Sequence, residues 1–326
     1  MPELSIIVPT KDRPDRVAEL VRRLHACSDE AEFELLVVDA SAGRDTERRL
    51  QAAGQSLGRS IHHIHKPGLD SPAARNLALE SARAAVCLFL NDDCWPLPGL
   101  LKGHVAFHRE HRETTAAMIG RAVPYWPYQP TPFERWLESS GFRHRYDDIH
   151  DPEDAGWRHF LTFNASAKLA LLRAVGGFDE RFSVGFEDNE LGFRLEGAGM
   201  RLRYDPDAVV EHFHPASLTT TLSQFRLYGR GRRLLAESRA EEPRPRRPGA
   251  RHRLAAACLA VPYALGVRTG RVRAASWRLL CVEAFREGYW NGPPPSDSGV
   301  RVGGRLAKLA CRDRAARFPV AATPAP

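Results

Sequence analysis

The chain has 326 residues, 43% of them hydrophobic, which is enough to bury the core of one sizeable α/β domain with an appendage. The formal net charge is +7, so the sequence favours an acidic partner: nucleic acid, an anionic membrane surface or a phosphate-bearing substrate. The six cysteines are scattered without a Cys-x-x-Cys pair, which excludes a disulfide scaffold and a cysteine zinc site and indicates reduced thiols.

Apolar runs mark three predicted strands in the first hundred residues, at 4–8, 33–38 and 86–90. Runs this continuous are typical of strands that are covered on both faces, as in a parallel sheet. Between the first two runs, apolar residues recur at helical spacing, and Asp12 is the expected cap of this helix. Another helix is predicted to begin at Ser71. The alternation predicts an α/β fold: a Rossmann-like, mostly parallel sheet flanked by helices, with ligands at the carboxyl ends of the strands.

The second half gives weaker signals. Residues 100–160 are rich in aromatic residues and proline, which predicts loops and short helices around a site. A helix is predicted to begin near Glu187 and to end near Gly197 or Gly199. A last short strand is predicted at residues 208–210.

A short polar cluster, Asn91, Asp92 and Asp93, follows directly after the apolar run at 86–90. The carboxyl end of a buried strand lies in the ligand crevice of this fold, where carboxylates can hold a divalent cation against a diphosphate. A turn that caps a helix is an equally good interpretation of this cluster taken alone.

Several motifs occur in one order: Pro9-Thr10 after the first run, Asp39 after the second, Arg75 within an Ala-Arg-Asn helix, and then Asn91 to Asp93. The series resembles the nucleotide-binding half of family 2 glycosyltransferases with the GT-A fold. The resemblance implies a turn beside the nucleobase, an aspartate that hydrogen-bonds the base, and an Asp-x-Asp motif that binds ribose and metal. The residues expected at the nucleotide are Pro9, Thr10, Arg13, Asp39, Ser41, Arg75, Asn91 and Asp92.

Some of these positions are ambiguous. Ala40 stands where the family usually has a second aspartate, and Asn91 takes the first position of the Asp-x-Asp motif. Asparagine still accepts a hydrogen bond from a ribose hydroxyl but carries no charge, so metal binding is expected to depend on Asp93. For Arg13, a solvated surface charge is as good an interpretation as a contact with the diphosphate.

A second group of motifs resembles the acceptor side of the same family, particularly its rhamnosyltransferase-like members. The Gly-Gly-Phe-Asp-Glu turn at 176–180 precedes Glu187 and Asp188. The resemblance extends over residues 3–215 and implies that Asp188 is the catalytic base, with Glu187 beside it. An isolated Glu-Asp pair would more simply stabilise the positive end of a helix.

The remaining site predictions concern the metal and the sugars. His212 and His214 would point to the same side of an extended segment, and only one need bind the cation; the resemblance favours His212. The expected cofactor is a divalent cation, Mn²⁺ or Mg²⁺. Trp157 and Asn164 are the candidates for contact with the acceptor or sugar, although a tryptophan is more often part of a core.

These observations predict an inverting glycosyltransferase that moves a sugar from a nucleotide diphosphate donor (UDP, dTDP or GDP type) to a hydroxyl of a glycan, a lipid-linked or a small-molecule acceptor. Inversion is implied by the resemblance alone. A nucleotidyltransferase would need a glycine-rich phosphate loop, and the turn at residues 9–12 has no glycine. A non-catalytic nucleotide-sugar or carbohydrate-binding module stays open because of Asn91 and Ala40. Nucleic acid is not expected as a partner, because the basic residues are spread out and no aromatic-basic reader motif is present.

The C-terminal helices combine apolar runs with arginines, which suits peripheral contact with an anionic membrane and equally suits packing against the catalytic domain. The start of the chain lacks the pattern of a signal peptide, and the longest low-charge run, at 254–267, is shorter than the roughly 20 apolar residues that cross a bilayer. We therefore expect a cytoplasmic protein, peripheral to the membrane at most.

The chain is expected to have four parts. They are a catalytic domain at 1–238 (nucleotide-binding half 1–100, acceptor half 101–238), a linker at 239–253, a helical extension at 254–292 and a tail at 293–326.

Overall fold

The computed structural model describes residues 1–27, 30–57, 61–183, 185–238, 245 and 270–291. The strands are β1 (Leu4–Thr10), β2 (Phe33–Asp39), β3 (His62–His65), β4 (Val86–Leu90), β5 (Cys94–Pro96), β6 (Ala116–Pro124), β7 (Asn164–Lys168) and β8 (Arg201–His212). The α-helices are α1 (Pro14–Ala26), α2 (Asp45–Leu57), α3 (Ser71–Ser81), α4 (Leu100–Glu110), α5 (Pro132–Ser139), α6 (Leu169–Ala174), α7 (Glu187–Gly197), α8 (Leu218–Ser238) and α10 (Gly270–Asn291). Two short 3-10 helices cover Tyr146–Asp148 and Trp157–His159.

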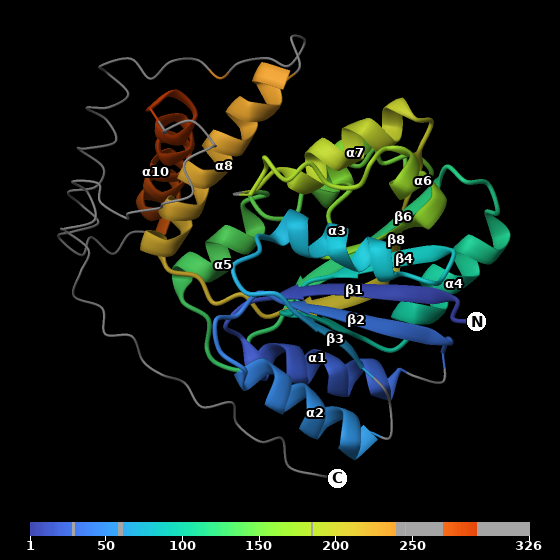
Figure 1. Ribbon diagram of the computed structural model, residues 1–326. Helices are drawn as coiled ribbons and strands as arrows, with labels where there is room; N and C mark the ends of the chain where they lie inside the picture. The colour runs from blue at the N-terminus through green and yellow to red at the C-terminus, as the bar shows by residue number, and fades with distance from the viewer. Residues whose placement is uncertain (28–29, 58–60, 184, 239–244, 246–269, 292–326) are drawn as a thin grey trace.

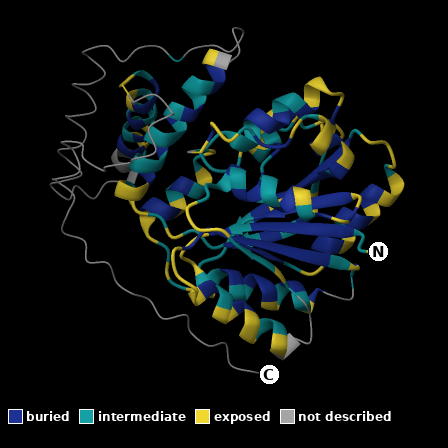
Figure 2. Cartoon of the chain, viewed as in Figure 1, coloured by how far each residue is buried: buried dark blue, intermediate teal, exposed yellow. Residues whose placement is uncertain are grey.

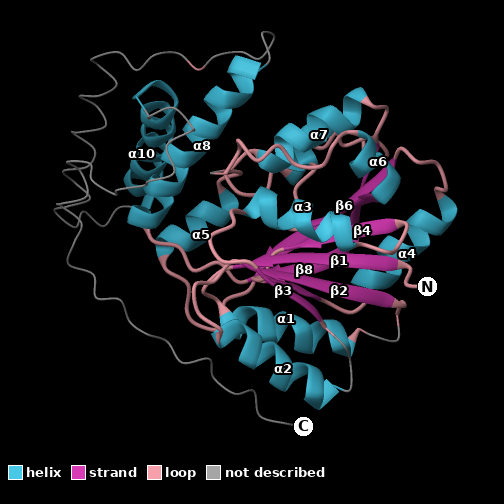
Figure 3. Cartoon of the chain, in the orientation of Figure 1, coloured by secondary structure: helices cyan, strands magenta, loops and turns pink. Residues whose placement is uncertain are grey.

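Within the described residues the strands form one eight-stranded sheet in the order β3-β2-β1-β4-β7-β6-β8-β5 (Figure 3). The first four of these run parallel to one another. Strand β7 runs antiparallel to both of its neighbours, β6 and β8 are parallel, and β5 closes the far edge antiparallel to β8. The predicted mostly parallel sheet with flanking helices is confirmed.

The sheet is covered on both faces, as the continuous apolar runs predicted. Successive side chains in a strand point to opposite faces. In β1, Ile6 therefore packs with residues of α1 and α4, whereas Ile7 packs with residues of α3, α6 and α7. Figure 1 shows α1 and α2 below the sheet and α3 and α7 above it, and Figure 2 shows the buried strands between them.

Several local predictions need correction. Asp12 does not cap α1: Arg13 occupies the cap position without a side-chain hydrogen bond, and Asp12 has a left-handed φ of 53°. The region 100–160 is more regular than predicted, since it contains α4 and the nine-residue strand β6. The predicted short strand at 208–210 is part of the twelve-residue strand β8, which begins at Arg201. Residues 203–207 of this strand do not alternate between buried and exposed positions.

The described C-terminal helix α10 packs against the domain. Helices α8 and α10 lie side by side at one end of the sheet (Figure 1). Cys281 and Ala284 of α10 are buried against Phe225 of α8, and Trp277 is buried against Phe133 of α5. This contact supports the packing interpretation for residues 270–291, which include the predicted helix at 274–289. The other predicted helix, at 254–266, the tail at 293–326 and, apart from residue 245, the linker at 239–253 lie outside the described residues.

The described cysteines, Cys27, Cys87, Cys94 and Cys281, are free thiols and buried. No helix among the described residues is both long enough and apolar enough to span a bilayer.

Candidate functional site

Parallel strands β1, β2 and β4 end at the same edge of the sheet and bring the predicted nucleotide residues together. Pro9, which has no backbone N–H, pairs with Val38 of β2 and lies just beyond the residues of β1 that pair with β4. At the end of β1, Thr10 Oγ1 donates to Asp92 Oδ2 over 2.7 Å and so ties the strand to the acidic segment after β4.

The Asp39 carboxylate points into the protein. It is wholly buried: Oδ1 accepts from the Ser41 N–H at 2.9 Å, and Oδ2 lies 3.4 Å from His63 Nε2. Ser41 Oγ accepts in turn from the Asp12 N–H at 2.7 Å. Asp39 therefore fixes the turn that follows β2 and joins it to the turn after β1, and its contact with a nucleobase stays a prediction.

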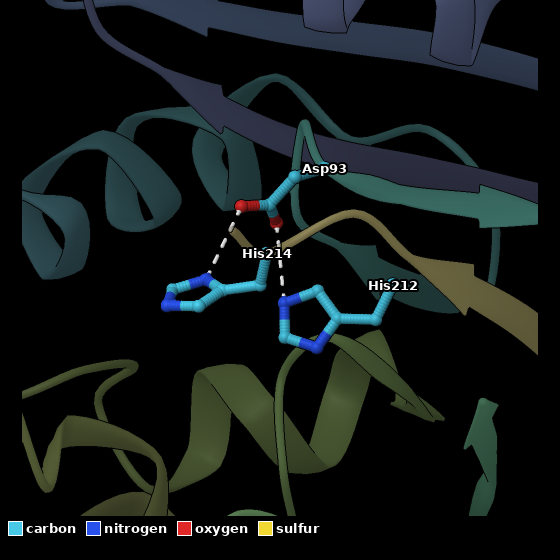
Figure 4. A group of neighbouring side chains, drawn as sticks. All are labelled: Asp93, His212 and His214. Carbon is cyan, nitrogen blue, oxygen red and sulfur yellow. Dashed lines mark ion pairs between the residues drawn. The ribbon is translucent and has the colours of Figure 1, made fainter. Parts of the chain in front are cut away.

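Pairing of β5 with β8 creates a cluster of one carboxylate and two imidazoles. His212 lies opposite Cys94 in this ladder, and the Phe213 N–H donates to the Asp93 carbonyl at 2.8 Å. His212 Nε2 lies 3.7 Å from Asp93 Oδ1, and His214 Nδ1 lies 3.8 Å from Asp93 Oδ2 (Figure 4). One ligand atom from each of the three side chains falls within 4.8 Å of the others. Both histidines, and not His212 alone, face Asp93.

The ionisation of this cluster suits a divalent cation. Burial lowers the pKa of His212 to about 3, although the Asp93 carboxylate opposes the shift. Burial acts to raise the pKa of Asp93, but the hydrogen bond from His214 and the charges of His212, His214 and Arg13 outweigh it and hold this pKa below its usual range. Near neutral pH the cluster thus offers an ionised carboxylate and a neutral imidazole, the states that bind metal. The mixed nitrogen and oxygen donors suit a cation that accepts imidazole as well as carboxylate more than they suit Mg²⁺, which is bound through oxygen.

Two arginines, Arg13 at the cap position of α1 and Arg16 in its first turn, reach the same carboxylates. Arg13 Nη1 lies 3.1 Å from Asp92 Oδ1 and 3.3 Å from Asp93 Oδ2. Arg16 Nη1 lies 3.0 Å from Asp93 Oδ2. Burial, followed by the charge of Asp93, raises the pKa of Asp92 to about 6. Arg16 was not predicted, yet its spacing of three from Arg13 places it on the same helix face.

Arg75 joins the two halves of the site. Its Nη2 donates to Asn91 Oδ1 and its Nη1 to Glu187 Oε1, both over 3.0 Å, and Ser71 Oγ accepts a further bond at 2.6 Å. The side chain of Arg75 is buried, so these contacts are shielded from water. Asn91 Oδ1 keeps a second lone pair that can accept from a ligand, and its amide nitrogen adds a donor that an ionised aspartate would lack.

Asp188 stands in the first turn of α7 beside Glu187, as predicted. Burial and the neighbouring Glu187 charge raise the pKa of Asp188 to about 7. A pKa near the working pH is the property required of a general base. Tyr228 of α8 faces these carboxylates, and burial and the Asp188 charge raise its pKa well above the usual range of a tyrosine. Gly231 of α8 lets this helix approach the backbone of Gly185 in the turn before α7.

The glycine-rich turn before α7 is attached to the Ala-Arg-Asn helix. Asn76 Nδ2 donates to the Phe178 carbonyl at 2.9 Å, and the Phe178 N–H donates to Asn76 Oδ1 at 2.8 Å. Gly177 has a φ of 69°, and a Cβ at this position would lie 2.6 Å from Asn76 Oδ1. The second glycine of the motif is therefore required by both its backbone conformation and this contact.

Gly177→Ala is expected to destabilise the protein by more than Gly176→Ala. Gly176 has a similar φ of 83° but open space around its Cβ position, so the difference between the variants isolates the clash with Asn76. We expect each variant to lose about 1–2 kcal/mol from backbone strain, with Gly177→Ala losing about 1 kcal/mol or more in addition. Urea unfolding measures both, and equal losses would show that Asn76 moves aside without cost.

The structure does not support sugar contact for Asn164 or Trp157. Asn164 is wholly buried: Nδ2 donates to the Ala208 carbonyl at 2.9 Å, and Oδ1 accepts from His104 Nε2 at 3.0 Å. Trp157 is 8% exposed and packs with Phe182 and Leu235. Both residues therefore belong to the core, because their polar or aromatic groups already have partners inside the protein.

Asn164→Ala is accordingly expected to lower stability and to leave acceptor binding intact. Removing the amide leaves His104 Nε2 and the Ala208 carbonyl buried without their partner, at a cost of about 1–3 kcal/mol for each unsatisfied group. Urea unfolding and the acceptor KM would be measured on the same preparation. A raised KM with unchanged stability would return Asn164 to the sugar site.

The parallel strand ends, the carboxylate and imidazole cluster and the buried arginine bridge define the class: an α/β protein of the GT-A type. A sequence model of the family described as Glycosyl transferase family 2 matches residues 5–167, half of the chain, and the chain belongs to this family. The family predicted from the sequence motifs is confirmed.

Relatives and solved structures agree with this assignment. The chain is 26% identical to the pre-mycofactocin glycosyltransferase of Mycobacterium tuberculosis over 70% of its own length and 46% of that protein. It is 28% identical to the O-antigen biosynthesis protein RfbC of Myxococcus xanthus over 66% of its length and 18% of that protein. It thus spans half or less of the length of these two relatives.

Two solved structures share the fold. The mannosyltransferase PcManGT of Pyrobaculum calidifontis, in complex with GDP-Man and Mn²⁺, superposes with a TM-score of 0.58 at 18% identity, covering 90% of this chain and 88% of that one. TarS of S. aureus gives a TM-score of 0.50 at 17% identity, over 88% and 55% of the two chains. At these identities the likeness concerns the fold alone.

Proposed function

We propose that this chain is an inverting glycosyltransferase that moves a sugar from a nucleoside diphosphate donor to an acceptor hydroxyl, with residues 1–238 as the catalytic unit. The observation that carries the proposal is the bridge made by buried Arg75. It joins Asn91, in the segment that ends in the Asp93 cluster, to Glu187, which adjoins Asp188. The residues proposed for the diphosphate and for the general base therefore belong to one hydrogen-bonded arrangement.

The chemistry assigned to Asp188 is proton removal. An acceptor hydroxyl within hydrogen-bond reach of Asp188 gives its proton to the carboxylate as its oxygen attacks the anomeric carbon. The bond from that carbon to the diphosphate breaks on the opposite side, so one displacement inverts the anomeric centre. Arg75 orients Glu187 and holds positive charge near both groups.

The leaving diphosphate gathers negative charge as this bond breaks. Asp93, His212 and His214 are the residues that would hold a divalent cation, and such a cation supplies positive charge to the diphosphate oxygens. Arg13 and Arg16 add two further cationic groups beside the same carboxylates.

The donor is proposed as a nucleoside diphosphate sugar of the GDP, UDP or dTDP type. The mannosyltransferase from Pyrobaculum calidifontis, which shares the fold, is in complex with GDP-Man and Mn²⁺. A glycan, a lipid-linked sugar and a small molecule are all acceptors that present the required hydroxyl.

A screen of nucleotide sugars against the full chain tests the proposal. Each donor would be incubated with Mn²⁺, with Mg²⁺ and with EDTA, water serving as the acceptor, and released nucleoside diphosphate would be measured. NMR recorded during the reaction, before the released sugar mutarotates, would give its anomeric configuration. Metal-dependent release from one donor and an inverted product are expected. Binding of a donor without release under any condition would favour a non-catalytic sugar-binding module instead.

A further inference from the structure

The carboxylates of the cation cluster are already balanced by charges from the protein itself. Asp92 and Asp93 carry the negative charges, and Arg13 and Arg16 supply an equal number of positive ones within 3.3 Å. The two histidines add no compensating anion. A divalent cation that enters alone therefore meets a site with no net negative charge, in surroundings where both carboxylates are shielded from water.

We propose that Arg16 makes the cation site incomplete until a diphosphate is present, so that metal and nucleotide bind as a unit. This inference rests on the proposed function, because it assigns the diphosphate as the anion that completes the site. Without the diphosphate, Arg16 opposes the cation by its positive charge and by its contact with Asp93 Oδ2. When the diphosphate is bound, its negative charge offsets the charges of both the cation and the arginine.

The position of Arg16 separates it from Arg13. The Arg16 side chain is 27% exposed, against 47% for Arg13, so water screens its charge less. Its guanidinium lies 5.2 Å from the centre of the ring of Phe213, the residue that stands between the two histidines in sequence. The charge of Arg16 is held next to the place where the cation would bind.

A consequence is that removing this charge strengthens binding of the bare metal. A neutral side chain at position 16 relieves the repulsion and removes one of the two arginine contacts to Asp93 Oδ2. A residue that merely held Asp93 in place would have the opposite effect, because losing it would weaken metal binding. By reciprocity, a nucleotide that tightens metal binding is itself bound more tightly when metal is present, and Arg16 enlarges this coupling.

The test is titration of the full chain with Mn²⁺, followed by electron paramagnetic resonance of free Mn²⁺. Arg16→Gln is expected to bind Mn²⁺ alone on the order of tenfold more tightly than wild type, because a nearby like charge is removed. Arg16→Lys, which keeps the charge, and Arg22→Gln, an exposed arginine of the same helix paired with Glu19, should match wild type. The gain in Arg16→Gln should shrink when GDP, UDP or dTDP is present at saturation.

Failure of the role of Arg16 and failure of the proposed function would give different results. Mn²⁺ binding that is unchanged or weaker in Arg16→Gln, while wild type binds, would overturn the role of Arg16 and leave the cation site standing. Absence of Mn²⁺ binding in every variant, with and without the three nucleotides, would overturn both. Thermal unfolding of each variant confirms that affinities are compared between folded proteins.

Discussion

Replacing Asp188 with asparagine is expected to lower kcat for sugar transfer by about 100-fold or more, the contribution of a positioned general base. Asparagine keeps the shape of the side chain and can still accept the hydrogen bond that the Asn189 N–H gives to Asp188 Oδ1 at 2.8 Å. The fold and the nucleotide site should therefore be unaffected. Initial rates with the preferred donor measure kcat, and calorimetric titration of the nucleoside diphosphate checks that binding is retained.

Asp207→Asn is the control for this variant, because Asp207 is an exposed aspartate in the neighbouring strand β8. It should behave like wild type in both measurements. Transfer by Asp188→Asn at the wild-type rate would remove Asp188 from the mechanism and direct attention to Glu187.

The pH dependence gives a second test of the same base. Only the ionised carboxylate accepts a proton, and the pKa of Asp188 is about 7, so kcat/KM should rise with pH through neutrality and level off above it. Glu187→Gln removes a negative charge that raises this pKa and leaves the Arg75 charge nearby. Its acid limb should therefore shift to lower pH. A profile that does not move would show that another group titrates.

What could be predicted from the sequence was local or periodic. The runs in β1, β2 and β4 are apolar throughout because both faces of the sheet are covered. Each run therefore predicts a buried strand without any knowledge of the tertiary contacts. The two histidines were expected to share a side because side chains two residues apart in an extended segment point the same way. Their meeting with Asp93 required the β5–β8 pairing, which no local pattern encodes.

The predictions that failed depend on tertiary contacts. Asn164 looks like a polar site residue, but it lies in the core because His104 and the Ala208 carbonyl satisfy its amide there. Helix α8 was not predicted, since Gly229 and Gly231 disfavour a helix by themselves. Both glycines are needed for close approach, Gly229 to α10 and Gly231 to the turn before α7. In each case a residue that is unfavourable locally is explained by a partner distant in sequence.

Asp93→Asn is expected to remove metal-dependent transfer. The substitution keeps the oxygen that accepts from Arg13 and Arg16 but removes the one charged ligand of the cluster, so Mn²⁺ should bind at least about tenfold more weakly. With less positive charge on the leaving diphosphate, kcat/KM should fall by on the order of 100-fold. Electron paramagnetic resonance measures Mn²⁺ binding, and initial rates over a range of Mn²⁺ concentrations measure transfer.

The direction of this effect is opposite to that expected for Arg16→Gln, although the two side chains touch. Asp93 attracts the cation and Arg16 repels it, so one variant should loosen Mn²⁺ binding and the other should tighten it. Asp15→Asn, an exposed aspartate of α1 paired with Arg49, controls for a general loss of acidic charge. If Asp93→Asn retained wild-type Mn²⁺ dependence, the cation would have to be held elsewhere. The pairing of β5 with β8 would then have to serve stability alone.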